Sequence, residues 1–463
     1  RSTSAAVSTR KSLEVDRNGQ GAIGEFRLSA GESEWVVCEA LADAVTPLSA
    51  FRAPQRLAQT VRYWKSWLHR SRYRGRWRRS VERSALLLKL LFYRPTGAMV
   101  AAPTTSLPER IGGVRNWDYR FAWVRDTALA VSSLFRLGYV EEATQFVYWL
   151  FGKFEEDASE MQIFYTVDGS RVPVEHRMPW LAGYRGSRPV RVGNAANTQV
   201  QNDKYGSAVI AAALLEYHGG IVSSDLWRQV RQLVQEAAKR WSRPDNGIWE
   251  VRTPARHHVY SKAMCWTALT WGTELGKSRG FDGPFEDWAA EAKAIRQDVL
   301  VNGRTPDGES LAWYYGAEGP DASLYRLPSL GFLRASDPVM VATARRMESD
   351  LVQDPFVYRY RLPDGLPAGE AFFLPCAFWR ANYYVHRGDL EFAKRALESI
   401  LDRTRPLGLF AEEIDGKGEP RGNFPQAFSH LAFINAATEL NGALDRRARR
   451  RRSRNLHAPP TSE

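Results

Sequence analysis

Apolar residues recur with a helical period over most of the chain, and turn-forming residues divide this pattern into separate segments. Segments such as SAVIAAALLEY and KAMCWTALTWGTEL are apolar nearly all round, and they alternate with amphipathic segments such as SDLWRQVRQLVQEAAKRW. A helix that is apolar all round must be enclosed, whereas an amphipathic helix can face water on one side. The pattern predicts helices near residues 77–94, 127–138, 140–155, 204–218, 223–242, 258–275, 284–301, 321–334, 337–352, 371–387, 389–404 and 425–441.

This alternation predicts a mainly α protein in which an inner ring of six helices lies within an outer ring of six, an (α/α)6 barrel of twelve helices. An open helical solenoid would show a similar alternation without closing into a ring, and it is the alternative. Pro375 falls inside the predicted 371–387 helix, where a proline would kink an inner wall.

The part of the chain before the barrel has a different pattern. Residues 21–45 alternate as short strands, too few to close a sheet of their own. They are interpreted as the end of a β-domain whose beginning is missing. The predicted organisation is a remnant of an N-terminal β-sandwich domain over 1–52 with a partly disordered start, a linker helix over 53–75, a catalytic barrel over 76–444 and a basic disordered tail over 445–463.

Composition narrows the class of protein further. The net charge of the 463-residue chain is +12, and seven of the positive charges lie in the tail, where they predict weak attraction to polyanions and no specific nucleic-acid recognition. Three cysteines far apart in the sequence favour a reducing cytoplasm. We expect no membrane span, and the sequence leaves the oligomeric state open. The seven arginines are Arg446, Arg447, Arg449, Arg450, Arg451, Arg452 and Arg454.

Unusual residues gather in the long loops that lead from an outer helix to the next inner helix. These loops hold NWDYRFAWVRD, VGNAANTQVQND, NGIWEVR, DGLPAGE and GLFAEEIDGKGEPRGNF, whereas the loops from inner to outer helices are short. In an alternating barrel the long loops emerge at one end, so their polar residues converge there. A cleft at that end is the predicted active site.

The first of these loops combines aromatic rings with charged groups that form paired hydrogen bonds. A pyranose offers an apolar ring face and a rim of hydroxyls, so this combination is typical of a sugar-binding cleft. Tyr119, Trp117, Trp123 and Trp249 are candidate stacking platforms. Arg125 with Asp126 could clamp sugar hydroxyls. The alternatives are an aromatic-rich buried loop and, for Asp126, a cap on the helix that follows.

Two glutamates are candidates for acid–base catalysis, because glycoside hydrolysis needs two carboxyl groups flanking the scissile bond. Glu250 lies between Trp249 and Val251, and apolar surroundings would raise the pKa of its carboxyl, which suits a general acid. Glu412 stands beside Glu413 in a glycine-rich loop with polar neighbours, which suits a general base. The alternative for either is an ordinary surface or salt-bridged glutamate.

Other chemistries lack their motifs. The sequence has no Gly-x-Ser-x-Gly elbow, no phosphate-cradling loop and no dinucleotide fingerprint after a strand. His257 and His258 are adjacent and would not face one another on a helix, so we expect no metal site.

Five blocks in order over residues 55–440 carry a family resemblance: TTSLPERIGGVRNWDYRFAWVRD, GYRGSRPVRVGNAANTQVQND, GIWEVR with HHVYSKAMCW, DGLPAGEAFFLPCAFW, and GLFAEEID with GNFPQAFSHLAFINAA. With them the chain resembles glycoside hydrolase family 15, the glucoamylases and trehalase-like enzymes of bacterial type. The resemblance implies an (α/α)6 barrel preceded by a β-sandwich, and an inverting mechanism. It implies no required cofactor, although some trehalase-type relatives are thought to depend on phosphate and magnesium.

The resemblance also implies roles for single residues. It places the general acid at Glu250 and the general base at Glu412. The residues that it implies for sugar binding are Tyr119, Trp123, Arg125, Asp126, Asn202 and Asp203, with a further arginine at Arg359 or Arg361, between which the spacing does not decide.

The resulting hypothesis is an inverting hydrolase that cleaves trehalose or α-linked gluco-oligosaccharides and releases β-D-glucose, with a small carbohydrate as its only expected partner. Two alternatives stay open. A phosphorylase on a related barrel would need one catalytic carboxyl and a phosphate pocket, and a catalytically degenerate sugar-binding protein would keep Arg125 and Asp126 but lose hydrolysis.

Overall fold

The computed structural model describes residues 4–16, 21–41, 45–154, 161–367, 369, 371–404 and 407–456. The chain divides into two compact units, residues 1–70 and residues 71–463. The boundary falls five residues before the end of the predicted linker helix.

The first unit holds short strands and one long helix. Strand β1 (Ser4–Ser8) pairs antiparallel with β4 (Val37–Leu41), and β2 (Glu14–Val15) pairs antiparallel with β3 (Ala22–Ile23). Helices α1 (Leu48–Phe51) and α2 (Ala53–His69) follow. Strands β3 and β4 fall within the predicted β segment 21–45, whereas β1 and β2 precede it, and the predicted linker helix ends at His69.

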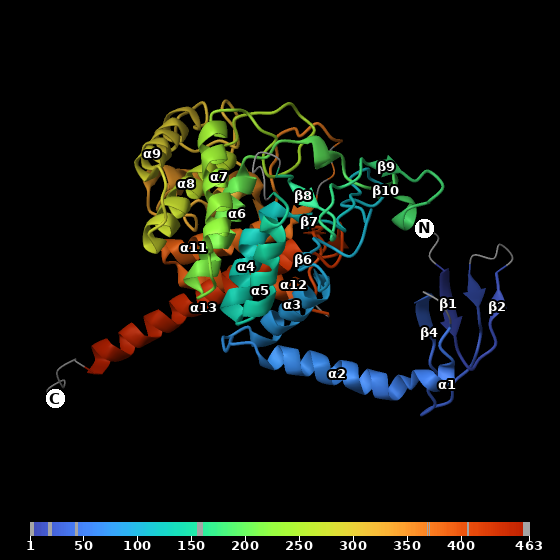
Figure 1. Ribbon diagram of the computed structural model, residues 1–463. Coiled ribbons are helices and arrows are strands. Elements are labelled where there is room, and N and C mark those ends of the chain that lie inside the picture. The colour runs from blue at the N-terminus through green and yellow to red at the C-terminus, as the bar shows by residue number, and fades with distance from the viewer. Residues whose placement is uncertain are drawn as a thin grey trace, which may run out of the picture. The chain divides into compact units, whose positions relative to one another are not determined.

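The second unit consists of helices in two layers (Figure 1). The inner elements are α4 (Val124–Leu137), α6 (Asp203–Tyr217), α8 (Val259–Arg279), the 3₁₀ helix η4 (Ala322–Arg326), α11 (Leu374–Arg387) and α13 (Ala427–Leu456). The outer helices are α3 (Arg78–Leu91), α5 (Val140–Phe151), α7 (Ser224–Arg240), α9 (Phe285–Asn302), α10 (Pro338–Leu351) and α12 (Leu390–Arg403).

The inner elements form a closed ring. Each one packs against the next along the chain, and α13 packs back against α4. Each outer helix packs on a neighbouring inner element. Because α13 meets α4, the (α/α)6 barrel is confirmed and the open solenoid is excluded.

One predicted inner helix is wrong. Residues 321–334 were expected to form an α-helix, but only Ala322–Arg326 are helical, as the 3₁₀ helix η4, and turns follow. Pro328 has no N–H to donate to the carbonyl of Leu324, and Gly331 has a φ of +79°, so an α-helix cannot continue here. The side chain of Asp321 accepts a hydrogen bond from Ser323 N and begins the short helix instead. All five residues of η4 are buried, so this element still fills its place in the ring.

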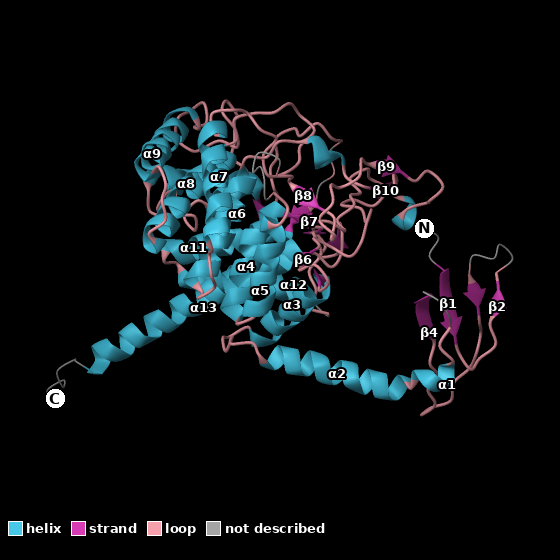
Figure 2. Cartoon of the chain, in the orientation of Figure 1, coloured by secondary structure: helices cyan, strands magenta, loops and turns pink. Residues whose placement is uncertain are grey.

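Short strands connect the long loops at one end of the helices (Figure 2). The pairs are β5 (Phe92–Tyr93) with β6 (Ala98–Met99), β7 (Ala122–Trp123) with β8 (Phe164–Tyr165), β9 (His176–Arg177) with β10 (Arg191–Val192), and β11 (Val352–Gln353) with β12 (Phe356–Val357). A three-stranded sheet has the order β13 (Phe372–Phe373), β14 (Glu413–Ile414) and β15 (Pro420–Arg421), and the loops also hold the 3₁₀ helices η2 (Tyr184–Gly186) and η3 (Ala195–Thr198).

Strand β13 explains why Pro375 does not kink the inner wall. Phe372 and Phe373 are paired with β14, so helix α11 begins at Leu374, three residues later than predicted. Pro375 therefore lies in the first helical turn, where the helix needs no backbone N–H from it. The same pairing holds the loop of Glu412 beside the start of α11.

The basic C-terminal segment differs from its prediction. Residues 445–456 were expected to be disordered, but they continue helix α13. Arginine is a good helix former, and Arg447 forms an ion pair of 3.1 Å with Glu391 of α12. The rest of the predicted tail, 457–463, lies outside the described residues. None of the helices that the structure describes has the length and apolar character of a membrane span.

Candidate active site

A cavity lies at the end of the ring where the long loops meet. We call it the loop-end cavity, and it consists of two adjoining hollows that share Tyr119, Trp249, Glu250 and Arg359. Residues at the starts of inner helices complete the wall of one hollow: Trp123, Arg125, Asp126, Phe373 and Phe428. Loop residues complete the other: Glu109, Arg115, Trp117, Arg252, Tyr360 and Asp364. The predicted convergence of remote loops at one end is confirmed.

Glu250 lies on this wall with donors around one of its oxygens. Its Oε1 accepts hydrogen bonds from Arg125 Nη1 at 2.8 Å, Trp123 Nε1 at 3.1 Å and Gln201 Nε2 at 3.2 Å. The expected apolar surroundings of Glu250 are therefore wrong, because sequence neighbours do not reveal donors from other loops. Within the described residues, Oε2 has no hydrogen-bond partner. Glu250 also has a φ of +52°, a conformation that costs a non-glycine residue about 1–2 kcal/mol.

Glu412 is fully buried behind the cavity wall. Its Oε1 accepts a 2.6 Å hydrogen bond from the hydroxyl of Tyr119, and its Oε2 accepts one of 3.1 Å from the backbone N–H of Asn423. Burial and the nearby carboxylate of Glu109 raise the pKa of Glu412 to about 8, although the Arg359 guanidinium opposes them.

Tyr119 links the two glutamates. Its hydroxyl binds Glu412, and its ring lies edge-on to Trp123 with centroids 5.3 Å apart, while Trp123 donates to Glu250. Burial raises the pKa of Tyr119, and the negative charges of Glu412 and, to a smaller extent, Glu250 raise it further. The structure therefore brings together two residues that lie far apart in the sequence.

Arg125 and Asp126 lie side by side on the wall at the start of α4. Arg125 Nε donates to Asp126 Oδ1 at 3.2 Å, and Arg125 Nη1 also donates to the carbonyl of Ile248 at 2.6 Å. Burial raises the pKa of Asp126 to about 6 despite the adjacent guanidinium. Asp126 does not cap the helix, because the N-cap position is Trp123 and no side chain caps it. A fixed fork of donors beside a buried carboxyl suits the hydroxyls of one sugar.

The structure distinguishes the two candidate arginines. Arg359 is buried on the cavity wall, and its Nη2 lies 2.9 Å from Glu413 Oε1 and 3.2 Å from Glu109 Oε2. Arg361 is exposed, and its guanidinium lies 4.3 Å from the ring centroid of Tyr358. Only Arg359 is therefore placed to meet a ligand in the cavity.

Trp249 lines both hollows, as expected for a residue on which a sugar ring could stack. Its indole N–H donates to Asp321 Oδ2 at 2.6 Å, and its ring meets the edge of Phe373 at 5.6 Å. These contacts fix the plane of the ring.

Asn202 and Asp203 do not line the loop-end cavity. The amide of Asn202 donates to the carbonyl of Arg240 at 3.3 Å, so Asn202 is turned toward an outer helix, contrary to expectation. Asp203 is buried, its carboxylate oxygens have no hydrogen-bond partner among the described residues, and burial raises its pKa to about 6. Arg125 lowers that pKa and Glu250 raises it, so Asp203 lies near the site without reaching its wall.

Glu109, Gln201 and Arg115 are among the residues at the site that the sequence did not predict. Glu109 is buried, accepts a 2.8 Å hydrogen bond from Trp117 Nε1 and acts on the pKa of Glu412. Gln201 binds Glu250, and Arg115 forms a buried 2.7 Å ion pair with Asp364 at the cavity wall. Glu109 and Gln201 lie in the loops already singled out, but a single polar residue in a long loop carries no signal of its own.

No group of three or more histidine, cysteine, aspartate or glutamate side chains in the described part of the chain is arranged to hold a metal ion. The site as described consists of carboxyl groups, guanidinium groups and aromatic rings.

A closed (α/α)6 ring with two glutamates and a sugar-type clamp at its loop end defines a class of protein, the glycoside hydrolases of this barrel type. Residues 75–438 match the model of glycosyl hydrolases family 15, and the chain belongs to this family. It is a glycosidase.

The curated relatives include trehalases. The chain is 41% identical over 433 residues to the trehalase of Thermoplasma volcanium, covering 93% of this chain and 69% of that protein. It is 40% identical to the trehalase of Thermoplasma acidophilum, over 94% of this chain and 75% of that protein. The trehalase of Mycolicibacterium smegmatis is 38% identical over 92% of this chain and 65% of its own length.

Solved structures share the fold at low sequence identity. A wild-type glycosidase matches with a TM-score of 0.63 and 20% identity, over 79% of this chain and 96% of its own. A bacterial glucoamylase complexed with acarbose matches with a TM-score of 0.60 and 16% identity, over 80% of this chain and 57% of its own. These two structures support the barrel fold and nothing finer.

Proposed function

We propose that this protein hydrolyses an α-glucosidic bond with inversion and releases β-D-glucose, and that its substrate is trehalose. The observation that carries the proposal is the meeting of Glu250 and Glu412 around Tyr119, beside the Arg125–Asp126 clamp. Three relatives named as trehalases, at 38–41% identity, support trehalose over other α-glucosides.

In the proposed mechanism Glu250 is the general acid. Its Oε2, which has no hydrogen-bond partner within the described residues, is the oxygen that would carry the proton to the leaving glucosyl oxygen. Arg125 contacts both Glu250 and Asp126, so a sugar held by the clamp would lie beside this acid. Trp249 and Tyr119 would contact the apolar faces of the sugar.

Glu412 is the proposed general base, which activates the attacking water. Because its pKa is raised to about 8, this carboxyl becomes fully ionised only above neutral pH. The Tyr119 hydroxyl and the Asn423 N–H stabilise the ionised form once it exists. Inversion by direct water attack requires the two carboxyl groups to stand about 6.5–9.5 Å apart.

A substrate panel tests the proposal. Purified protein is incubated with trehalose, maltose and isomaltose, and glucose release is measured in the presence and absence of inorganic phosphate. We expect cleavage of trehalose with free glucose as the only product. Formation of glucose 1-phosphate would identify a phosphorylase, and binding without release of glucose from any substrate would identify a sugar-binding protein.

A further inference from the structure

The loop that leads from η3 into helix α6, residues 199–202, is bonded to the loop of Glu250. The backbone N–H of Val200 donates to Asn246 Oδ1 at 3.0 Å, and the backbone N–H of Asn246 donates to the carbonyl of Val200 at 2.8 Å. These two bonds join the loop to the segment that leads into Glu250, and they bring Gln201 beside that residue.

Two glutamine side chains of this loop contact Glu250 and the residue after it. Gln199 Nε2 donates to the carbonyl of Val251 at 2.9 Å, so it holds the backbone next to Glu250. Gln201 is buried, and its Nε2 donates to Glu250 Oε1 at 3.2 Å, so it holds the carboxyl itself. Glu250 has a φ of +52°, and such a conformation persists only where the surroundings hold it.

The hydrogen bonds that the described residues donate to the carboxyl of Glu250 all reach one oxygen. Oε1 accepts from Gln201, Trp123 and Arg125, whereas Oε2 has no partner within the described residues. The side chain is 21% exposed and lines both hollows. In a protonated carboxyl one oxygen only accepts and the other carries the O–H. Because Oε1 already has three donors, the proton of the neutral acid lies on Oε2.

Gln201 differs from the other two donors because it has no second contact at the site. Arg125 also binds Asp126 in the sugar clamp, and Trp123 lines the loop-end cavity. Gln201 lines neither hollow, and among the described residues its side chain binds Glu250 alone. Removing its amide therefore disturbs the acid without removing a contact to the sugar.

We propose that Gln201 is a positioning residue for the general acid, which holds the carboxyl of Glu250 so that Oε2 faces the leaving glucosyl oxygen. This inference rests on the role of Glu250 in the proposed function. The proton passes from Oε2 to that oxygen as the bond from C1 to the oxygen breaks, and the bonding electron pair leaves with the oxygen. Glu250 is then a carboxylate, whose charge the donors on Oε1 stabilise.

Two substrates that differ in their need for a proton test the proposal. A glucosyl oxygen needs a proton to leave, whereas fluoride leaves α-D-glucosyl fluoride as a stable anion. We expect Gln201→Leu to lower kcat for trehalose by about 10- to 100-fold, which is what a misplacement of about 1 Å costs. Its kcat for the fluoride should change little. Glu250→Gln should show the same selective loss, whereas a general disturbance of the fold would slow both reactions.

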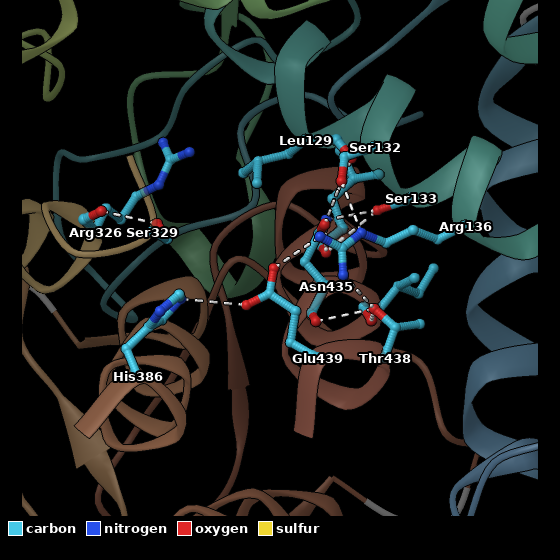
Figure 3. Close-up of polar contacts among 12 residues, drawn as sticks. Leu129, Ser132, Ser133, Arg136, Arg326, Ser329, His386, Asn435, Thr438 and Glu439 are labelled. Atoms are coloured by element: carbon cyan, nitrogen blue, oxygen red, sulfur yellow. Dashed lines mark hydrogen bonds and ion pairs between the residues drawn. The ribbon is translucent and has the colours of Figure 1, made fainter. Parts of the chain in front are cut away.

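Asn435→Leu is the matched control, because it also replaces a buried side-chain amide by leucine. Figure 3 shows the contacts of Asn435, whose amide donates to the carbonyl of Leu129 at 3.3 Å and to Ser133 Oγ at 2.8 Å. None of these three residues lines the loop-end cavity. The ratio of the rates on trehalose and on the fluoride should therefore be the same as in the unsubstituted protein.

Gln201→Glu keeps the shape of the side chain and replaces the amide donor by an oxygen. It keeps the test decisive if Gln201→Leu fails to fold, which a thermal melt checks. Equal losses on both substrates, or no loss on either, would overturn the proposal.

The unsubstituted protein separates this inference from the proposed function. If it cleaves maltose but not trehalose, the proposed substrate is wrong, and the ratio of maltose to fluoride cleavage tests Gln201 instead. If it cleaves no α-glucoside at all, the proposed function and this inference are both overturned.

Discussion

At the residue scale, the acid–base chemistry of the site depends on what surrounds each carboxyl group. Sequence neighbours placed Glu250 between apolar residues, but its actual contacts come from Trp123, Arg125 and Gln201, which belong to other loops. Burial raises the pKa of Glu412 most, and the carboxylate of Glu109, a residue about 300 positions earlier, raises it further. The types of the site residues could be read from the sequence, whereas their electrostatic surroundings could not, because those depend on which loops meet.

The acid assignment predicts the effect of Glu250→Gln. The amide can still accept from Arg125 and Trp123 but has no proton to give, so turnover of trehalose should fall by about 10²–10⁴-fold. Affinity should be retained, and calorimetry with trehalose measures it in the same variant. Full turnover in this variant would remove Glu250 from the mechanism.

The base assignment predicts a particular pH dependence. A base must be ionised, so kcat/KM should be lost as pH falls through the raised pKa of Glu412, which is about 8. Glu109→Gln removes the largest charge effect that raises this pKa, so the acidic limb of the profile should move to lower pH. If Glu109→Gln moves the alkaline limb instead, Glu412 is the acid and the two roles are reversed.

At the element scale, a glycine turn holds Glu412 in place. Gly422 precedes the Asn423 that donates to Glu412, and it has a φ of +69°. A Cβ at this position would lie 2.4 Å from Glu412 Oε2 and 2.8 Å from its Cβ. The loop between β15 and α13 therefore accepts no side chain at this point without displacing the carboxyl.

Gly422→Ala should accordingly reduce kcat by one to two orders of magnitude, about what a misplacement of 1 Å costs. Gly280→Ala is the matched control, because Gly280 has a similar φ of +65° but nothing within 4 Å of an added Cβ. Both variants should lose about 1–2 kcal/mol of stability from backbone strain, measured by urea unfolding. Equal activity of the two variants would contradict the positioning role of the turn.

Two elements were predicted incorrectly from the sequence, and each error has a local explanation. Periodicity predicted a helix over 321–334, but Pro328 and Gly331 allow only the 3₁₀ helix η4. Two aromatic residues before Pro375 looked helical, yet they pair as a strand with β14. In both places the residues are apolar, and apolar residues fit the predicted α-helix as well as the observed element. The backbone conformation therefore determines which element forms.

At the scale of the whole molecule, the alternation of apolar and amphipathic segments predicted two layers of helices. It could not show that the ring closes, because closure depends on the contact between α13 and α4. The same holds for Arg359 and Arg361. Their spacing in the sequence did not show which of the two side chains lines the cavity, and the structure places Arg359 there.

The closed ring also encloses carboxyl groups, and these predict how stability depends on pH. Burial raises the pKa of Asp245 to about 7, so the folded state holds this proton more tightly than the unfolded chain. The stability that it contributes is complete below the ordinary aspartate pKa and is lost as pH rises through about 7. The free energy of unfolding of the unsubstituted protein should therefore fall between pH 4.5 and 7.5 relative to that of Asp245→Asn. The difference should change by up to about 1.4 kcal/mol per pH unit.

Urea unfolding of both proteins at those two pH values, followed by tryptophan fluorescence, checks this prediction. A difference in unfolding free energy between the two proteins that does not change with pH would show that Asp245 does not titrate in the folded state.

The central claim is that Glu250, on the wall of the loop-end cavity, and Glu412, buried behind that wall, act together so that water attacks the bond from one side. Proton NMR of glucose in the first minutes of trehalose hydrolysis tests it most directly, because the two anomers give separate signals before they equilibrate. Hydrolysis of an α,α-linked disaccharide by inversion should give one β and one α glucose per bond cleaved. Exclusive initial release of α-glucose would mean retention and would contradict the account.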